Sequence, residues 1–315
     1  MITDSTILRI FFVLIVGIFF SCHQEQGPPV DTPTSGNITI AADESFRPII
    51  QEELDMFHHT YKDAHITVRW VNENEALDLL MNDSVHTIII PRKLSKEEIK
   101  SFGSSGYNPH PVKIAYDALA FIINEKNPNQ SWPVEKISDL FAGKISSWKN
   151  FNPSSDLGDM KVVFDNKNSS TANYLAGKLV GGDAFPAYCY ALDSTAAVID
   201  YVRKNVSAIG VVGVNWVMDR RDTTNNTWLP GILPLSIYPA DTAKGAGESY
   251  QPYQSDIALK NYPFVREICC IVHEPRNGLG TGFATFIANE AGQRIILKSG
   301  LVPATAPVRL VKFVK

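Results

Sequence analysis

The sequence predicts an α/β protein of two lobes, with mostly parallel sheets that carry helices on both faces. Strand-like and helix-like segments alternate from residue 37 to residue 102 in a β-α-β-α-β rhythm, which is typical of parallel sheets. Residues 112–124 then form one apolar extended run that is too long for an average strand. A second alternation follows this run. We therefore expect two α/β lobes joined by a shared strand, with a ligand cleft between them.

In the first half of the chain, each predicted element follows from the spacing of its apolar residues. Ile49, Ile50 and Leu54 recur with Phe57 at spacings that suit one face of a helix. The segment HITVRW alternates as a strand should, and VHTIII ends in three isoleucines. The predicted strands are residues 37–41, 65–70 and 85–90, and the predicted helices are residues 47–61, 75–81 and 96–102.

The same signals recur less clearly in the second half. Residues 219–230 and 238–255 are polar or loop-like, and the glycine-rich stretch 278–282 is interpreted as a flexible turn. The last predicted element is a single amphipathic helix over residues 283–298. The other predicted strands are residues 161–164, 208–214, 232–237 and 266–273, and the other predicted helices are residues 137–141, 171–180 and 195–202.

The N-terminal segment is not expected to fold with the rest. Residues 10–20 are an apolar run of eleven, which as a helix spans roughly 17 Å and is short of the ~30 Å hydrocarbon core of a bilayer. Such a run is normal in a signal sequence. Ser21-Cys22 follows and resembles a lipobox, which implies cleavage after residue 21 and a lipid chain such as palmitate on Cys22. An uncleaved signal-anchor and a plain secretory signal remain open. Residues 22–35 carry three prolines and are predicted to be a tether.

Charge and cysteine content exclude several classes of protein. The chain has 29 Lys+Arg and 33 Asp+Glu, a net charge of −4, whereas nucleic-acid binders normally show a basic excess. Four cysteines in 315 residues cannot form a disulfide scaffold. Beyond Cys22, we expect Cys189, Cys269 and Cys270 to be buried free thiols, although a bridge from Cys189 to one of the adjacent pair stays open.

Three polar segments lie next to predicted strand ends, where α/β proteins can bind anions. Residues 168–171 (NSST) open a predicted helix, and Asp43-Glu44-Ser45 open the first one. Arg92 and Lys93 follow the strand at residues 85–90, where a guanidinium can bind an oxyanion with two hydrogen bonds. Taken alone, the first two segments are better explained by simple helix capping, and the third by a solvated loop.

No catalytic or metal-binding constellation is apparent in the sequence. The chain lacks G-x-S-x-G, a P-loop lysine and H-E-x-x-H spacing. His58, His59 and His65 are interpreted as surface histidines. We therefore expect a protein that is not an enzyme and that needs no cofactor and no metal.

Several segments in the same order carry a resemblance to a known family. Residues 137–149 (ISDLFAGKISSWK) are similar to a segment of the form L-x-D-I-F-x-G-K-I-x-x-W, and residues 112–124, 208–213, 262–266 and 286–303 also match. The chain resembles the phosphate-type substrate-binding proteins of bacterial ABC importers, which have a type II periplasmic-binding-protein fold. The resemblance implies a clamshell, with residues 36–115 plus 231–315 in lobe one and residues 116–230 in lobe two.

The resemblance also implies ligand-binding residues. Ser169, Ser170 and Thr171 match the family's S-G-T turn, and Ser45 with Glu44 occupies the place of its G-S-T-S loop. The family's anion-pairing arginine is replaced by Asp165, and Val85-His86-Thr87 replaces its A-D-I strand. A phosphate site would need another cation. The candidates are Arg47, Arg92 and Lys167, and Arg92 completes the predicted site.

The function implied is capture of phosphate or a related small oxyanion by a monomeric, lipid-anchored protein of the cell envelope, facing the periplasm or the exterior. Its partners would be ABC permease subunits and, through Cys22, the membrane. The alternative keeps the fold as a membrane-tethered binding or sensing module with a neutral or cationic ligand. Asp43, Glu44 and Asp165 motivate that alternative. An exported hydrolase is a third class of function, but the sequence contains no motif that indicates one.

Overall fold

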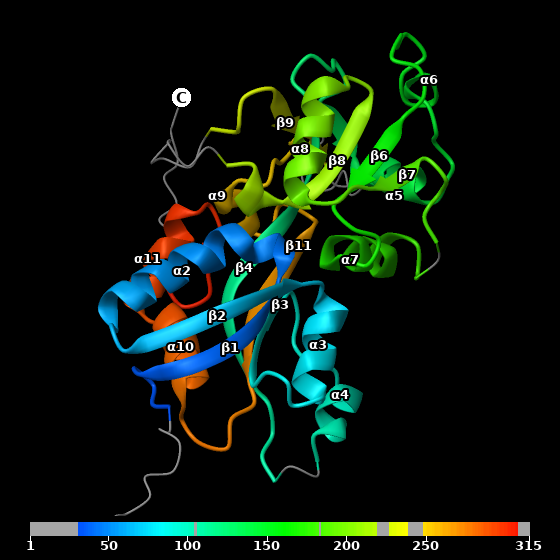
Figure 1. The fold of residues 1–315 in the computed structure, drawn as a ribbon. Coiled ribbons are helices and arrows are strands. Elements are labelled where there is room, and N and C mark those ends of the chain that lie inside the picture. Colours follow the sequence, from blue (N-terminus) through cyan, green and yellow to red (C-terminus); the bar gives the residue numbers. More distant parts are fainter. Residues whose placement is uncertain (1–30, 104–105, 183, 219–226, 239–247, 308–315) are drawn as a thin grey trace, which may run out of the picture. The chain divides into compact units, whose positions relative to one another are not determined.

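A mixed β-sheet built around one long strand organises the fold (Figure 1). The computed structural model describes residues 31–103, 106–182, 184–218, 227–238 and 248–307. Ten strands of these residues pair into one sheet, and two more, β5 (Ser131–Pro133) and β10 (Ser236–Tyr238), form a separate pair. The strands of the large sheet are β1 (Gly36–Asp43), β2 (Ala64–Val71), β3 (Thr87–Ile90), β4 (His110–Asn124), β6 (Lys161–Phe164), β7 (Cys189–Ala191), β8 (Ala208–Gly213), β9 (Ile232–Pro234), β11 (Val265–Val272) and β12 (Val302–Pro303).

Strand β4 is the long shared strand that its apolar run predicts. Its first part pairs with β11, up to the register Val265–Ala118, and its last part pairs with β8 and β9. The outer strands are parallel as expected, since β1 pairs with β2 and β3, and β6 with β7 and β8. The sheet as a whole is mixed rather than mostly parallel. The reason is that β11 lies between β3 and β4 and runs antiparallel to both, and that β4 also runs antiparallel to β8, β9 and β12.

Helices cover both faces of the sheet around β1 and β3, as the sequence predicts. Ile40 and Ala42 of β1 pack in one apolar cluster with α2 (Arg47–Thr60) and α10 (Leu279–Ala288), while Ala41 packs in another with α3 (Glu73–Met81). This alternation is the period of two that a strand imposes on its side chains. The remaining helices are η1 (Glu44–Phe46), α4 (Lys96–Ser101), α5 (Val134–Phe141), α6 (Trp148–Phe151), α7 (Ser170–Leu179), α8 (Thr195–Lys204), η2 (Val214–Trp216), α9 (Gln254–Ala258) and α11 (Glu290–Lys298).

Two predicted elements are each divided in two. The helix predicted over residues 283–298 is wrong as one element, because Asn289 adopts an extended backbone and its side chain accepts hydrogen bonds from the N–H groups of Ala291 and Gly292. An Asn at this position is a preferred N-cap, so it ends α10 and starts α11. The strand predicted over residues 232–237 becomes β9 and β10, which pair with different partners, β4 and β5.

The glycine-rich stretch 278–282 is the start of α10 and not a flexible turn. The Glu274 carboxylate accepts hydrogen bonds from the N–H groups of Gly278, Gly280 and Thr281 and from the Thr281 hydroxyl. A carboxylate at a helix N-terminus satisfies donors that have no partner in the helix. Glu274 lies outside the stretch, which explains why the local glycine pattern suggested a loop.

Among the described residues, Cys189, Cys269 and Cys270 are free thiols as predicted, and Cys269 and Cys270 are fully buried, but Cys189 is only partly buried. Among these residues, no helix has the length and apolar character needed to cross a bilayer. The predicted signal peptide, Cys22 and most of the predicted tether lie outside the described residues, as does most of the polar stretch 219–230. The two lobe boundaries stay predictions.

Glu53 is a buried carboxyl on α2 that the apolar periodicity does not explain. Its side chain is fully buried, and within the described residues neither carboxyl oxygen has a hydrogen-bond partner. Burial raises the pKa of Glu53 to about 9, because the charged form would lose its hydration. The group is therefore protonated at neutral pH.

This leads to a prediction for stability against pH. The folded protein binds one proton more than the unfolded chain between the ordinary glutamate pKa and about 9, so the free energy of unfolding should fall as pH rises through this window. The slope attributable to Glu53 is about 1.4 kcal/mol per pH unit. Denaturant unfolding of Glu53→Gln between pH 6 and 9 should remove that part of the slope. The exposed Glu97→Gln on α4 is the control and should keep it.

Candidate ligand-binding site

A buried ion pair across the centre of the sheet holds the site together. Arg266 of β11 and Asp117 of β4 are register partners, and Arg266 Nε donates to Asp117 Oδ2 at 2.8 Å. Their side chains are 1% and 0% exposed. Gly213 on β8 leaves room for the pair, since a Cβ there would come within 3.2 Å of Asp117 Oδ2. Charged side chains are almost never buried this completely unless they are paired.

The other two nitrogens of Arg266 bring together two distant segments of chain. Nη1 donates to Ser170 Oγ at 2.9 Å, and Nη2 donates to Ser45 Oγ at 3.1 Å. Ser45 lies in η1, directly after β1, and Ser170 begins α7, directly after the loop that follows β6. The guanidinium also stacks on the Phe46 ring, with its carbon 4.8 Å from the ring centroid. Arg266 thus sets the position of both serines.

The loop at Ser45 is held from its far side as well. Its carbonyl oxygen accepts hydrogen bonds from Asn215 Nδ2 at 3.1 Å and Trp216 Nε1 at 2.8 Å, both from η2. Next to Ser170, the preceding residue Ser169 caps α7, since its side chain accepts a hydrogen bond from the Ala172 N–H. Both serines therefore sit on backbone that is fixed independently of any ligand.

The side chain of Asp43 occupies the centre of this cluster. Its Oδ1 accepts hydrogen bonds from the Ser45 N–H at 2.9 Å, the Ser45 hydroxyl at 2.5 Å and the Ser170 hydroxyl at 3.0 Å. Asp43 is 2% exposed, and within the described residues its Oδ2 has no hydrogen-bond partner. Burial raises the pKa of Asp43 to about 6, against the opposing effects of Arg266 and the hydrogen bonds.

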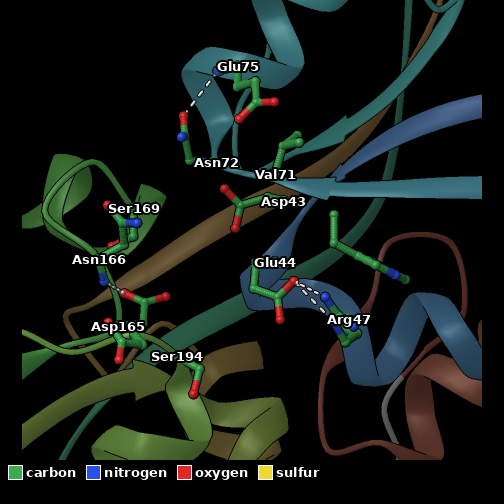
Figure 2. A pocket seen from close by; sticks show the side chains of 12 residues that line it. Asp43, Glu44, Arg47, Val71, Asn72, Glu75, Asp165, Asn166, Ser169 and Ser194 are labelled. Atoms are coloured by element: carbon green, nitrogen blue, oxygen red, sulfur yellow. Dashed lines mark hydrogen bonds and ion pairs between the residues drawn. The ribbon is translucent and has the colours of Figure 1, made fainter.

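Asp43 also lines a pocket of about 480 Å³ with a strongly acidic wall (Figure 2). The five carboxyl groups that line it face one guanidinium, Arg47, which is itself paired with Glu44 at 2.6 Å and lies over the Trp70 ring. Among the described residues, no group of three His, Cys, Asp or Glu could hold a metal ion. The lining residues are Asp43, Glu44, Arg47, Trp70, Val71, Asn72, Glu75, Asp165, Asn166, Ser169, Asp193 and Ser194.

The structure brings together part of the predicted site. Ser45 and Ser170 meet at Asp43, with 3.3 Å between their hydroxyl oxygens, and Glu44 and Ser169 line the pocket. Thr171 is buried in the first turn of α7 and is not among the residues that line the pocket. The assignment of these residues to ligand binding stays a prediction.

Two of the three candidate cations, Arg92 and Lys167, lie outside the acidic pocket. Arg92 does not line the pocket and is held by Glu73 at 2.5 Å and Glu98 at 2.7 Å, the latter being part of the capping box of α4. These carboxylates raise the pKa of its guanidinium. Lys167 lines a different pocket, beside Phe185 and Cys189. Only Arg47 lines the acidic pocket.

Arg266 and Asp117 are not among the site residues predicted from the sequence. Asp117 is the only charged residue in the segment YDALAFIIN, and Arg266 lies beside Glu267 at the start of the otherwise apolar segment VREICCIV. Because such residues are rarely buried without a partner, the two strands could have been matched to each other from this signal. Asp43 was recognised only as a possible helix cap, since nothing in the sequence places Ser170 beside it.

The buried ion pair is predicted to contribute far more to the free energy of unfolding than an exposed ion pair does. Asp117→Asn should lower the free energy of unfolding by about 3–5 kcal/mol, because it leaves the Arg266 charge buried without its counterion. Denaturant unfolding at pH 7 measures this. Glu290→Gln breaks the exposed Arg294–Glu290 pair and is the control, with an expected change of about 0–1 kcal/mol. Equal effects of the two substitutions would contradict the role given to the buried pair.

Comparison with known proteins gives one family model and a consistent set of relatives. A model described as a PBP superfamily domain matches residues 27–291. The phosphate-binding protein PstS of Pseudomonas aeruginosa is 21% identical over 291 residues, covering 87% of this chain and 85% of that protein. A protein of Clostridium perfringens described as a phosphate ABC transporter substrate-binding protein, solved with bound phosphate, has a TM-score of 0.70 at 22% identity and covers 85% of this chain and 100% of its own.

A further solved structure agrees with these. The ABC-type phosphate transport receptor of Vibrio cholerae has a TM-score of 0.65 at 17% identity and covers 84% of this chain and 99% of its own. The two structural matches confirm the predicted α/β fold, and the relatives are named as binding proteins and not as enzymes. Since the family model covers most of its length, this chain belongs to the PBP superfamily and is a binding protein, not an enzyme.

Proposed function

We propose that this protein captures a small polar solute that carries positive charge, and that it does so in the acidic pocket. The observation that carries the proposal is Asp43, which lines the pocket and whose buried oxygen Oδ2 has no hydrogen-bond partner among the described residues. A buried acceptor in this state costs free energy, and a ligand N–H group would satisfy it.

Electrostatics favours a cation over an anion in this pocket. Asp165 is 6% exposed, and Glu44, Glu75 and Asp193 add three further carboxyl groups around the same space. Of these groups, Asp43 and Asp165 are buried, so an anion placed beside them would lose its hydration and be repelled, whereas an ammonium or guanidinium group would be attracted to them. The volume of about 480 Å³ is that of a pocket for a small molecule.

The position of the pocket supports capture by closure of two lobes. Its lining residues come from residues 43–75, in the first predicted lobe, and from residues 165–194, in the second. Hinge closure around a ligand would bury the solute between them. The names of the relatives support a permease of an ABC importer as the partner, and the apolar run before Cys22 supports anchoring of the mature protein at the outer side of a membrane by a lipid.

Phosphate is the second candidate ligand. The relatives are named for binding it, and Ser45, Ser170 and Arg266 supply the hydroxyl and guanidinium donors that suit an oxyanion. To use these donors, phosphate would have to displace the carboxylate of Asp43. Because of this requirement, we rank phosphate as a less favoured ligand than a cationic solute.

Titration calorimetry of the purified protein at pH 7.5 tests the ligand class. We expect heat of binding with members of a panel of polyamines, basic amino acids and quaternary ammonium compounds, and none with phosphate. Asp165→Asn should weaken the bound amine about 10-fold, because it removes one facing charge. Glu97→Gln, which changes the net charge equally but lies on α4, should leave the affinity unchanged.

The same titration has a pH dependence with a defined sign. Below about pH 6, Asp43 takes a proton, so the affinity for a cation should fall as pH is lowered through this value. Binding of phosphate by the wild-type protein, with no binding of any amine, would refute the proposed ligand class.

The anchoring proposal predicts a change of location. Cys22→Ala removes the thiol to which the lipid would be attached, so the protein should move from the membrane fraction to the soluble extracytoplasmic fraction. Fractionation and immunoblotting measure this, with Cys189→Ala as the control that should stay with the membrane. If Cys22→Ala remained membrane-bound, the lipid anchor would be wrong.

A further inference from the structure

We infer that the Asp43 side chain is a built-in occupant of an oxyanion seat, so that this protein excludes phosphate and similar oxyanions from a site otherwise equipped to bind them. The seat consists of the Ser45 N–H, the hydroxyls of Ser45 and Ser170, and the guanidinium of Arg266 behind the hydroxyls. The inference concerns which ligands are refused, and it stands apart from the identity of the solute that the pocket accepts.

Local capping does not account for this arrangement. An aspartate that accepts a hydrogen bond from the N–H two residues later is an ordinary cap, and this explains the bond from the Ser45 N–H. It does not explain Ser170, which comes from α7 and is 127 residues away in sequence. Three donors from two segments converge on the single atom Oδ1, although a carboxylate oxygen offers only about two lone-pair positions. A cluster of donors around one oxygen is the pattern expected for a bound oxyanion.

The hydroxyl protons of the seat are already used in hydrogen bonds to Asp43. Each serine hydroxyl has one proton, and both protons are donated to Asp43. The serine oxygens in turn accept from Arg266, whose Nε is engaged by Asp117. A phosphate oxygen that entered the cluster would find no free serine proton and would lie against an internal carboxylate. Asp43 therefore fills the place of the ligand oxygen in both position and charge.

The backbone permits the decisive substitution. Asp43 has φ −61° and ψ 129°, an extended conformation that alanine adopts without strain. Asp43→Ala would remove the internal carboxylate and leave the donors in place, because η1 and α7 are fixed by Asn215, Trp216 and the Ser169 cap. Asp43→Asn would keep an oxygen that can accept the same hydrogen bonds, so the seat would stay filled without a negative charge.

Calorimetry with sodium phosphate and sodium sulfate at pH 7.5 tests the inference. Wild-type protein and Asp43→Asn should show no binding at about 10 mM anion, while Asp43→Ala should gain at least about 100-fold in affinity, as expected when two charge-assisted hydrogen bonds become available. Adding Ser170→Ala to Asp43→Ala should abolish the gain, which locates the new anion site at this seat.

Thermal unfolding provides a second readout that does not require Asp43→Ala to be stable in plain buffer. Acetate, a free carboxylate, should raise the melting temperature of Asp43→Ala and leave that of the wild type unchanged. Three results would each overturn the inference: tight phosphate binding by the wild type, an equal gain for Asp43→Asn, or a folded Asp43→Ala that neither binds phosphate nor responds to acetate. A panel of amines that fails to bind the wild type would instead refute only the proposed solute class.

Discussion

The buried ion pair between Arg266 and Asp117 is the interaction on which the site depends. It joins β11 to β4 at the middle of the sheet, where water cannot compensate either charge. With Nε committed to Asp117, the two remaining nitrogens of the guanidinium are aimed at Ser45 and Ser170. One planar group thereby fixes the end of β1 and the start of α7 against a common point.

The protein interior has a low polarity, which strengthens this pair. For the same reason, the charge of each other buried carboxyl depends on whether it has a partner. Glu53 has no counterion in the described part of the chain and is neutral, whereas Asp43 has Arg266 nearby and three donors on one oxygen. Asp43 lines the acidic pocket, and its Oδ2 has no hydrogen-bond partner in the described part of the chain. The fold is shared with relatives named for binding phosphate, and the pocket of this chain is lined by five carboxyl groups and one guanidinium. Ligand choice depends on the site and not on the fold.

Most elements of the fold follow from local patterns, because apolar periodicity and caps act over a few residues. β1, α2, β2, β4 and β8 appear within a few residues of their predicted bounds. The errors arise where a distant or single polar group intervenes. Asn289 divides one helix, Glu274 organises a glycine-rich stretch that lies after it in sequence, and β11 enters the sheet from the other end of the chain. Among candidate residues, those on helix starts were found and those inside strands were missed.

The amino-acid sequence by itself determined the α/β class, the long shared strand, the absence of a catalytic motif and the acidic departures at the ligand loops. These are properties of residue type and short-range spacing. Only the tertiary structure decided that Arg266 lies beside Ser170 while Arg92 is held by Glu73, and that Asp43 accepts a hydrogen bond from Ser170. The physical reason is that Ser170 lies 127 positions from Asp43 and 96 positions from Arg266 in the sequence. The energy of these contacts comes from burial and mutual geometry, which no local pattern records.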